Sequence, residues 1–482
     1  MVPLLGEWRT AGSGVPGYRA LADRLRLLVL EGRLPVGTVL PSERTLATAL
    51  DTSRTTTTSA YRQLREEGFA VGSQGAGTWT TLPASDPDVV TPTWPINSDG
   101  EPGPGGGRGD FSSAATEAPP QLYVAYQAAL AEMPRYLPGN GYVTSGLPVL
   151  RERIAARYTE RGLPTTADQI LITNGALQAL HLVLDVVAQR GDRVLVEHPT
   201  YPAAAEAIKA RGGRPVPFPV ETGWDVDRAR TLLRQTGAQL AYLMLDFHNP
   251  TGALLDAAGR RRLGAVLAET GCTAIVDETM VDLDLREALH GRPFETPRPM
   301  ASYVSSEQVI CLGSASKTLW GGLRIGWIRA SKPLIRRLAM ARSNADLGSP
   351  VLEQLACAHL IDNLEPVVTA RRLELARRCL ALRDALASAL PEWDVPLPDG
   401  GMSLWAHLPE PRSTQVAASA RALGVRLAPG PHFGLDGAFE SRLRLPFARP
   451  VEDLLPMVGL LARAWGSTGG LDLVDDDELT TV

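Results

Sequence analysis

Five short apolar runs in the middle of the chain are each followed at once by polar or glycine-rich residues. Helical patterns separate most of these runs, which favours a mainly parallel sheet in an α/β domain. In such a sheet, ligand-binding groups gather at the carboxyl ends of the strands, so we expect the polar residues there to form one site. The runs are Ile170–Ile172, Arg193–Val196, Gln239–Leu245, Thr273–Val276 and Val309–Leu312.

The last of these runs leads into a segment, residues 313–319, in which Lys317 stands among small and hydroxyl-bearing residues. Only three of the 48 basic residues in the chain are lysines. A lysine amine can lose its proton when it is desolvated and can then attack an aldehyde, which a guanidinium cannot do. Ser314, Ser316 and Arg324 carry donors that can hold a phosphate. The segment therefore indicates a lysine bonded to pyridoxal phosphate (PLP); the alternative is an exposed lysine in a Ser/Gly loop.

The composition is that of an ordinary soluble protein, with 44% hydrophobic and 21% charged residues. A length of 482 residues allows two or three domains. The net charge of −5 does not indicate that the chain as a whole binds nucleic acid. The four cysteines lack zinc spacing, so we expect reduced thiols, a cytoplasmic protein and no metal site. We find no signal-peptide pattern and no apolar run of about 18 residues, so we expect no membrane span.

The first 81 residues carry a net charge of +2 and predict a small helical domain. An amphipathic pattern over residues 17–32 is followed by two short helices, which begin near Ser42 and Ser53. Gly68 ends the second of them, and two strand-like segments flanking residues 72–76 predict a hairpin. Two short helices joined by a tight turn, followed by a hairpin, indicate a winged helix-turn-helix.

This stretch resembles the winged helix-turn-helix of the GntR family over nearly its whole length. The resemblance implies double-stranded DNA as a partner. The alternative is that the two arginines in the pattern, Arg44 and Arg54, are solvated charges. Trp79-Thr80 stands where the family usually has Phe-Val, which we expect to affect packing of the wing strand. The shared pattern is Gly37-x-x-Leu40-Pro41-Ser42-Glu43-Arg44, Ser53-Arg54-Thr55-Thr56, Ala60-Tyr61-x-x-Leu64, Glu67-Gly68 and Gly75-x-Gly77-Thr78.

The resemblance also implies which residues reach the DNA. Side chains at the start of the second helix would enter the major groove, and the wing tip would approach the minor groove. The residues implied are Arg44, Ser53, Arg54, Thr55, Thr56, Thr57 and, at the wing tip, Gly75.

Composition also suggests where the domains begin and end. Residues 82–109 are rich in Pro, Gly and Asp and are expected to form a flexible linker, and residues 469–482 an acidic tail. We therefore expect a DNA-binding domain at 1–81 and a second domain at 110–468. Within the second, we expect a large domain at about 140–340 and a small α+β domain at about 345–465, containing long helices between residues 351 and 390. Its predicted strands are Trp393–Leu397, Gly401–Ala406, Val425–Leu427 and Leu443–Pro446.

Residues 110–465 resemble the fold-type I aminotransferases, because the polar residues follow the strands in the same order. The resemblance implies that Lys317 carries PLP as an internal aldimine, that Asp277 pairs with the pyridine nitrogen, that Asn249 bonds the ring hydroxyl and that Tyr201 stacks on the ring. Arg444 would bind a substrate or effector carboxylate. The residues implied to hold the phosphate are Gly175, Ala176, Ser314, Ser316 and Arg324, with Tyr136 reaching in from a partner subunit.

Alternatives remain for single residues, and two positions depart from the aminotransferase pattern. Tyr201 could be a core aromatic residue, and Asp277 could be a helix cap. Met280 stands where the family usually has a tyrosine that bonds the ring hydroxyl. Leu177 stands where many relatives have a polar residue. Both departures favour a ligand sensor over a fast enzyme.

A GntR-type helix-turn-helix, a linker and an aminotransferase-like domain, in this order, resemble the MocR subfamily of bacterial transcription regulators. The resemblance implies a head-to-tail homodimer that binds DNA and senses PLP, an amine or an amino acid through an aldimine. A second hypothesis is a catalytically active PLP-dependent aminotransferase of class I/II with a DNA-binding appendage. A third is that PLP itself is the effector.

Overall fold

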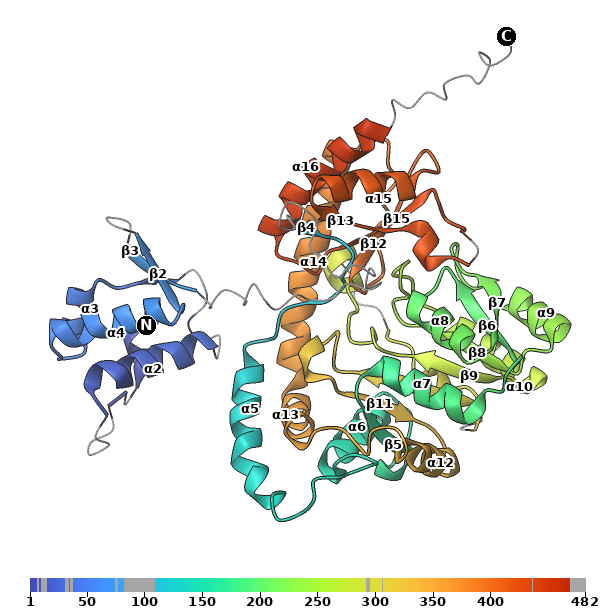
Figure 1. Ribbon diagram of the computed structural model, residues 1–482, viewed down its shortest axis with the longest axis horizontal. Coiled ribbons are helices and arrows are strands. Elements are labelled where there is room, and N and C mark those ends of the chain that lie inside the picture. The colour runs from blue at the N-terminus through green and yellow to red at the C-terminus, as the bar shows by residue number, and fades with distance from the viewer. Residues whose placement is uncertain are drawn as a thin grey trace, which may run out of the picture. The chain divides into compact units, whose positions relative to one another are not determined.

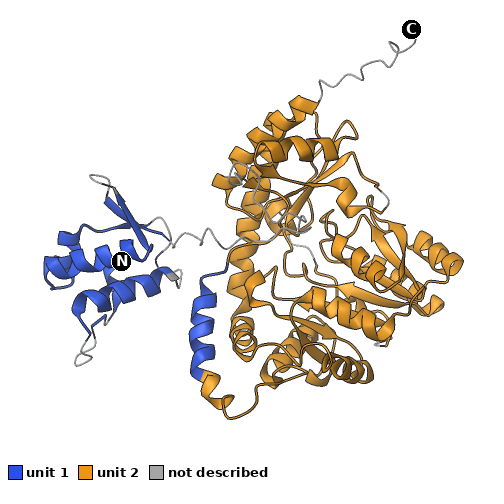
Figure 2. Cartoon of the chain, viewed as in Figure 1, with its two compact units in different colours: residues 1–92, 118–131 blue, residues 93–117, 132–482 orange. Residues whose placement is uncertain are grey.

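The computed structural model describes residues 1–468 except 7, 10–14, 31–33, 35–37, 74–76, 82–108, 292–294, 306 and 436. The chain forms the helices and strands labelled in Figure 1. They fall into two compact units, residues 1–92 with 118–131 and residues 93–117 with 132–482 (Figure 2). The predicted linker, apart from Gly109, and the predicted acidic tail lie outside the described residues. Within the described part of the chain, no helix is long and apolar enough to cross a bilayer.

The first unit contains the predicted winged helix-turn-helix. Its three strands form an antiparallel sheet in the order β1-β3-β2, and β1 was not predicted. Trp79 lies on the central strand, paired with Val39 and Val71. The helices are α1 (Val2–Leu5), α2 (Gly17–Leu30), α3 (Glu43–Ala49) and α4 (Arg54–Glu66), the strands are β1 (Val39–Leu40), β2 (Ala70–Ser73) and β3 (Gly77–Thr80), and α5 (Gln121–Glu132) belongs mainly to the same unit.

Serine caps fix where α3 and α4 begin. The Oγ atoms of Ser42 and Ser53 accept hydrogen bonds of 3.1 Å from the backbone N–H groups of Thr45 and Thr56. Each cap satisfies an N–H that has no partner within the helix. The Tyr61 hydroxyl donates to the carbonyl of Pro41 at 2.9 Å and so ties α4 to the start of α3. The core of this unit includes Leu21, Leu25, Leu28, Leu46, Tyr61 and Leu64.

A seven-stranded sheet organises the second unit, in the order β5-β11-β10-β9-β8-β6-β7. All strands are parallel except β11, so the predicted mainly parallel sheet is confirmed. All five predicted strands are present. The strands are β5 (Ile170–Thr173), β6 (Arg193–His198), β7 (Arg214–Pro219), β8 (Leu240–Leu243), β9 (Thr273–Asp277), β10 (Val309–Ser314) and β11 (Gly326–Arg329).

Helices follow most of these strands. Apolar residues of α7, α8 and α12 pack with the strands in one buried cluster. The helices of this region are α6 (Pro148–Glu160), α7 (Ala176–Val187), α8 (Pro202–Ala210), α9 (Val226–Thr236), α10 (Ala257–Thr270), α11 (Arg286–His290) and α12 (Lys332–Arg342).

The carboxyl-terminal part forms the predicted α+β region, with a separate core. An antiparallel sheet has the order β12-β15-β14, and β4 pairs in parallel with β13. The predicted strand Trp393–Leu397 is wrong, because only an isolated bridge from Asp394 to His407 forms there. Pro396 lacks the N–H that a ladder needs. The elements are α13 (Val351–Asp362), α14 (Leu364–Ala389), α15 (Ser413–Ala422), α16 (Val451–Thr468), β4 (Gly109–Asp110), β12 (Ser403–His407), β13 (Val425–Arg426), β14 (Ala428–Pro429) and β15 (Arg442–Pro446).

Candidate ligand site and DNA-binding surface

The register of three strands brings the predicted phosphate-binding residues together. Thr173 of β5, Gly326 of β11 and Ser314 of β10 are neighbours across the sheet. A Cβ atom on Gly326 would lie 2.5 Å from the carbonyl carbon of Gly175, so only glycine lets the chain before α7 pass this close. Gly175 has a φ of 89°, which turns the chain from β5 into the start of α7 at Ala176.

Arg324 lies against the same turn. Its Nη2 atom donates to the carbonyl of Asn174 at 2.9 Å, and the Ser314 and Ser316 hydroxyls are 2.9 Å apart. The first N–H groups of α7 have no acceptor within the helix, and the helix dipole favours an anion there. This arrangement is a suitable cradle for a phosphate. Its members are Gly175, Ala176, Ser314, Ser316 and Arg324.

Lys317 follows β10, is half-buried, and feels the opposite charges of Arg444 and Asp277. Its Nζ atom donates to the carbonyl of Ala114 at 2.7 Å. Burial and then the positive charge of Arg444 lower the pKa of Lys317 to about 8, while Asp277 opposes them. The amine is therefore still mostly protonated at pH 7, but its neutral form, which nucleophilic attack on an aldehyde requires, is far more abundant than for an exposed lysine.

Asp277 ends β9 and is held from two sides. One carboxylate oxygen accepts from the Tyr242 hydroxyl at 2.8 Å, and the other accepts from the backbone N–H of Thr279 at 2.9 Å. We did not predict Tyr242 as a site residue. The two-residue period of a strand puts Ile275 and Asp277 on one face of β9. Only the register of the sheet, which pairs Tyr242 with Ile275, brings Tyr242 to that face, so the sequence carried no signal for it.

Arg444 on β15 is 7% exposed and already has two acceptors. Its Nη1 atom donates to Asn249 Oδ1 at 3.3 Å, and its Nη2 atom donates to the carbonyl of Ser112. Its guanidinium carbon lies 4.7 Å from the centre of the Phe433 ring. Its Nε atom is buried without an acceptor within the described residues. Burial lowers the pKa of Arg444 to about 10, so the side chain is still a cation at neutral pH and has a donor free for a carboxylate.

Buried polar contacts hold the loop that carries Asn249. Arg260 and Asp246 form a fully buried ion pair of 2.7 Å, and Arg260 also donates to the carbonyl of Leu245. Buried charges are tolerated when they are paired in this way. This contact fixes the loop after β8, three residues before Asn249.

A second buried group, Glu197, holds the same loop. Its carboxyl group accepts from Trp224 Nε1 at 2.5 Å and from the N–H of Met244 at 2.6 Å. Burial raises the pKa of Glu197 to about 8 and lowers that of His248 to about 3. Since His248 Nε2 lies 3.5 Å from the carboxyl group, this contact joins two groups that are mainly uncharged at neutral pH.

The remaining predicted ligand residues occupy different positions. Tyr201 is half-buried at the start of α8, and burial and then the negative charge of Asp277 raise its pKa. Tyr136 is half-buried after Arg135, in a stretch that exposes Leu137. Met280 is buried in the core of the carboxyl-terminal part and offers no hydroxyl.

No cluster of three or more His, Cys, Asp or Glu suited to a metal occurs in the described part of the chain.

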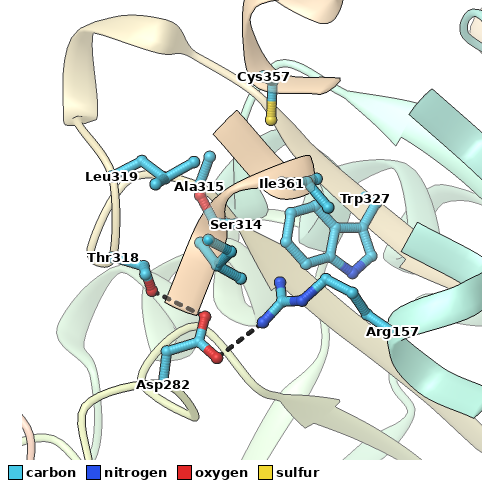
Figure 3. Close-up of a pocket in the computed structure, with 10 residues that line it drawn as sticks. Arg157, Asp282, Ser314, Ala315, Thr318, Leu319, Trp327, Cys357 and Ile361 are labelled. Atoms are coloured by element: carbon cyan, nitrogen blue, oxygen red, sulfur yellow. Dashed lines mark hydrogen bonds and ion pairs between the residues drawn. The ribbon is translucent and has the colours of Figure 1, made fainter. Parts of the chain in front are cut away.

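A small pocket lies directly beside the segment that carries Lys317. Figure 3 shows Asp282 between Arg157 and Thr318, with Arg157 Nη2 at 2.7 Å and Thr318 Oγ1 at 3.0 Å from its two oxygens. Burial alone would raise the pKa of Asp282, but the positive charges of Arg157 and Arg161 outweigh burial and lower it. The ion pair therefore holds Thr318, next to Lys317, from within the protein.

The candidate DNA-binding residues lie on the first unit. Arg44 and Arg54 are exposed, and neither forms an ion pair with any described residue. Ser53 and Thr55 are exposed as well, and Thr56 is half-buried. The predicted wing-tip residue Gly75 lies outside the described residues.

Thr57 is placed differently. Its side chain is fully buried, and its hydroxyl donates at 2.9 Å to the carbonyls of Glu43 and Arg54. A side chain inside the domain cannot touch a base, so this burial argues against the predicted DNA contact of Thr57. Its position instead locks α4 against α3.

Comparison with known proteins finds a matching family for each of the two units. Residues 17–79 match the bacterial regulatory proteins of the gntR family, and residues 122–458 match the aminotransferase class I and II family. The chain is 29% identical over 433 residues to the HTH-type transcriptional regulator YisV of Bacillus subtilis, covering 83% of this chain and 86% of that protein. It is 28% identical over 444 residues to the probable rhizopine catabolism regulatory protein MocR of Rhizobium meliloti, covering 86% of each.

This chain belongs to the aminotransferase class I and II family. In it, a GntR-type DNA-binding domain precedes the aminotransferase domain, and its relatives among the HTH-type regulators include MocR, which is consistent with the MocR subfamily. A solved structure with a similar second unit is LysN, an alpha-aminoadipate aminotransferase from Thermus thermophilus, complexed with N-(5'-phosphopyridoxyl)-L-leucine. The TM-score is 0.67 with 28% identity, and the match covers 75% of this chain and 93% of LysN. The second unit therefore has the aminotransferase fold of a PLP-dependent family.

Proposed function

We propose that this regulator binds PLP in its second unit, and that an amine or amino acid bound beside PLP changes its affinity for DNA. The observation that carries the proposal is the environment of Lys317. Its amine is desolvated between Asp277 and Arg444, and its pKa is lowered to about 8. Perturbed pKa values of this kind gather at functional sites.

The residues present fit PLP. The cradle at the start of α7 suits its phosphate, Asp277 suits a protonated ring nitrogen, Asn249 suits the ring hydroxyl, and Tyr201 suits the ring face. When bound, PLP supplies an aldehyde and an electron-withdrawing ring. Lys317 supplies a neutral amine to that aldehyde, and the Tyr242 hydroxyl keeps the Asp277 carboxylate in one orientation.

Arg444 selects the class of ligand. Its buried Nε–H has no acceptor among the described residues, and an unpaired buried donor costs about 1–3 kcal/mol. A ligand carboxylate satisfies this donor and pairs with the guanidinium charge. We therefore expect α-amino acids to bind more tightly than simple amines, which lack the carboxylate.

At the DNA, we propose that Arg44 and Arg54 reach phosphates or guanine edges, with Ser53, Thr55 and Thr56 lying near the major groove. The proposal includes a cytoplasmic homodimer, arranged head to tail. In it, Tyr136 would complete the phosphate site of the other subunit. A net charge of +2 on residues 1–81 is small for a DNA-binding domain, so two copies are needed for tight binding.

The test combines PLP binding with DNA binding. Purified protein is titrated with PLP while its visible absorbance is recorded. Binding to its own upstream DNA is then measured at fixed salt with PLP and each of a panel of amino acids and matched amines. We expect saturable PLP binding and a change in DNA affinity that depends on the ligand's carboxylate. Saturable PLP binding with one unchanged DNA affinity under every condition would overturn the regulatory part.

A second candidate function is amino-group transfer. It is favoured by the similarity to an aminotransferase and by the retention of Lys317, Asp277 and Arg444 in one site. Replacement of the usual tyrosine by the buried Met280 removes a donor from the ring hydroxyl and counts against fast turnover. Formation of keto acid from an amino acid and a keto-acid acceptor, lost in Lys317→Ala, would establish it.

A further inference from the structure

The segment after the linker supplies two acceptors to the ligand site. We name residues 110–117 the strap. Its Ser112 carbonyl accepts from Arg444 Nη2, and its Ala114 carbonyl accepts from Lys317 Nζ at 2.7 Å. These two donors are the cations that the proposed function assigns to the ligand carboxylate and to PLP. One short segment therefore contacts both.

Asp110 fixes the amino-terminal end of the strap. One of its oxygens accepts from the Ser112 N–H at 2.7 Å and from the Ser112 hydroxyl at 2.5 Å. Its other oxygen pairs with Arg426 Nη2 at 3.2 Å. The adjoining strand β4 pairs with β13 (Figure 1). A side-chain acceptor that bonds the backbone two residues on sets the direction of a turn, and here it sets where the Ser112 carbonyl points.

Two arginines of α14 hold the other end. Arg371 Nη2 donates to the carbonyl of Glu117 at 2.8 Å, and Arg378 Nη1 lies 3.5 Å from the Glu117 carboxylate. The strap is thus fixed at both ends. Between them the Phe111 N–H donates to the Arg426 carbonyl at 2.8 Å, while the Ser112 and Ala114 carbonyls accept from the ligand-site cations. The bonds to those two strap carbonyls are the ones that a ligand can change.

We infer that Asp110 is a positioning residue for the ligand site, and that the strap links occupancy of that site to the linker leading to the DNA-binding unit. The inference rests on the proposed function. Asp110 acts through the Ser112 and Ala114 carbonyls, which hold Arg444 and Lys317 in their ligand-free positions. In sequence, residues 82–109 join the strap to the DNA-binding unit.

The strap and the ligand compete for Arg444 and Lys317, and this competition couples ligand binding to the position of the strap. Arg444 Nη1 and Nη2 already donate to Asn249 Oδ1 and to the Ser112 carbonyl, so a carboxylate that takes two donors of this guanidinium comes close to an acceptor already present. The two acceptors would repel each other there. Lys317 would likewise leave the Ala114 carbonyl to hold PLP. Because ligand and strap share these two cations, each would weaken the hold of the other, and the coupling is reciprocal.

Three variants separate this role from a general structural one. Asp110→Ala removes the acceptor for Ser112. Asp110→Asn keeps one oxygen for Ser112 and loses only the charge, and Arg426→Gln removes only the ion pair. The probe is N-(5'-phosphopyridoxyl)-L-leucine, which carries the phosphate, the ring and a carboxylate without turning over. Its affinity, the hydrogen exchange of residues 109–117 and binding to upstream DNA are measured on the full chain.

We expect Asp110→Ala to bind the probe about fivefold more tightly, because roughly one net hydrogen bond no longer competes. Its ligand-free strap exchanges faster, as the wild-type strap does with the probe bound, and its ligand-free DNA affinity moves toward that of the liganded wild type. Asp110→Asn and Arg426→Gln stay within about twofold of the wild type. Weaker probe binding in Asp110→Ala, or a wild-type strap whose exchange ignores the probe, would overturn the inference.

Failure of the proposed function gives a different result. If neither PLP nor the probe binds the wild type, the proposed function is wrong. The strap's hold is then tested without ligand: Lys317→Ala removes the bond to Ala114, so exchange in residues 109–117 must rise. Unchanged exchange in Lys317→Ala would overturn the strap's role independently of PLP.

Discussion

In the DNA-binding unit, all candidate contacts except Gly75 lie in one short stretch, residues 44–57, and four of them, Arg44, Ser53, Arg54 and Thr55, are exposed. In the ligand unit, the candidates are scattered from Tyr136 to Arg444. Several are buried, and Asn249 and Arg444 are bonded to each other. The first surface is built by helix caps that act within a few residues. The second is built by strand register that acts across the sheet.

This difference predicts how substitutions in each region affect folding and binding. Exposed residues such as Arg54 can be replaced with little effect on folding, and the loss appears in DNA affinity. Buried residues such as Arg444 and Asp277 have partners that lose a bond when they are replaced. The sharpest tests are therefore single-atom or single-charge changes with a matched control.

The largest effect is expected from Lys317→Ala. Without the amine, the absorbance band of PLP bonded to Lys317 disappears, while the phosphate cradle still allows weak binding of PLP as the free aldehyde. Lys332→Ala is the matched control, because Lys332 is exposed and pairs with Asp168 at the surface. Titration with PLP, followed by absorbance, checks both variants. Unchanged absorbance in Lys317→Ala would mean that another group holds the aldehyde.

A change at the DNA surface comes next. Arg54→Ala should weaken binding to the operator about tenfold and lower the slope of affinity against salt by about one, since one cation is lost. PLP absorbance should stay as in the wild type. Fluorescence anisotropy at several salt concentrations measures this.

Thr57→Val compares a buried residue with the exposed Arg54 in the same helix, α4. Its hydroxyl is buried on two carbonyls, so its loss should lower the free energy of unfolding by about 1 kcal/mol. DNA affinity of the folded protein should be unaffected. A large loss of DNA affinity in Thr57→Val, with stability intact, would contradict its placement inside the domain.

The pH dependence of PLP association tests the buried charge pattern. The neutral amine reacts, and the pKa of Lys317 is lowered to about 8. The association rate should therefore rise about eightfold between about pH 7 and about pH 8.5, and level off above that. Arg444→Gln removes a positive neighbour, so the Lys317 pKa should rise and the curve should shift to higher pH. A shift to lower pH would contradict the stated role of Arg444.

Tyr242→Phe should have the smallest effect. It removes the donor to Asp277 and keeps the ring in β8, so PLP affinity should fall about fivefold. Tyr158→Phe is the control, because that hydroxyl is also buried but bonds Trp327. Equal losses in the two variants would show a general effect of burial instead of a role at Asp277.

Much of the fold was predictable, because local signals matched the final structure. Ser42 and Ser53 cap the helices that they were expected to begin, and the five apolar runs are strands. The edge strand β7 was missed because its three prolines, at positions 215, 217 and 219, suggest a loop. At a sheet edge the missing N–H groups are tolerated.

The ligand residues were predicted from their order along the chain, but their partners were not. Tyr242 and Ser112 act through contacts with residues far away in the sequence, which no periodic pattern reveals. Thr57 was misjudged because a helix start gives no sign of which face is buried. Burial depends on the neighbouring helix α3, whose Glu43 carbonyl meets the Thr57 hydroxyl.

The measurement that tests the central claim most directly is the affinity of the wild type and Lys317→Ala for upstream DNA at fixed salt, each with and without PLP and a panel of amino acids. The account predicts that a bound ligand changes the wild-type affinity several-fold and leaves Lys317→Ala nearly unchanged. If PLP alone produces the change, PLP is the effector. Equal ligand responses in the two proteins, or no response in a wild type that visibly binds PLP, would contradict regulation through this site.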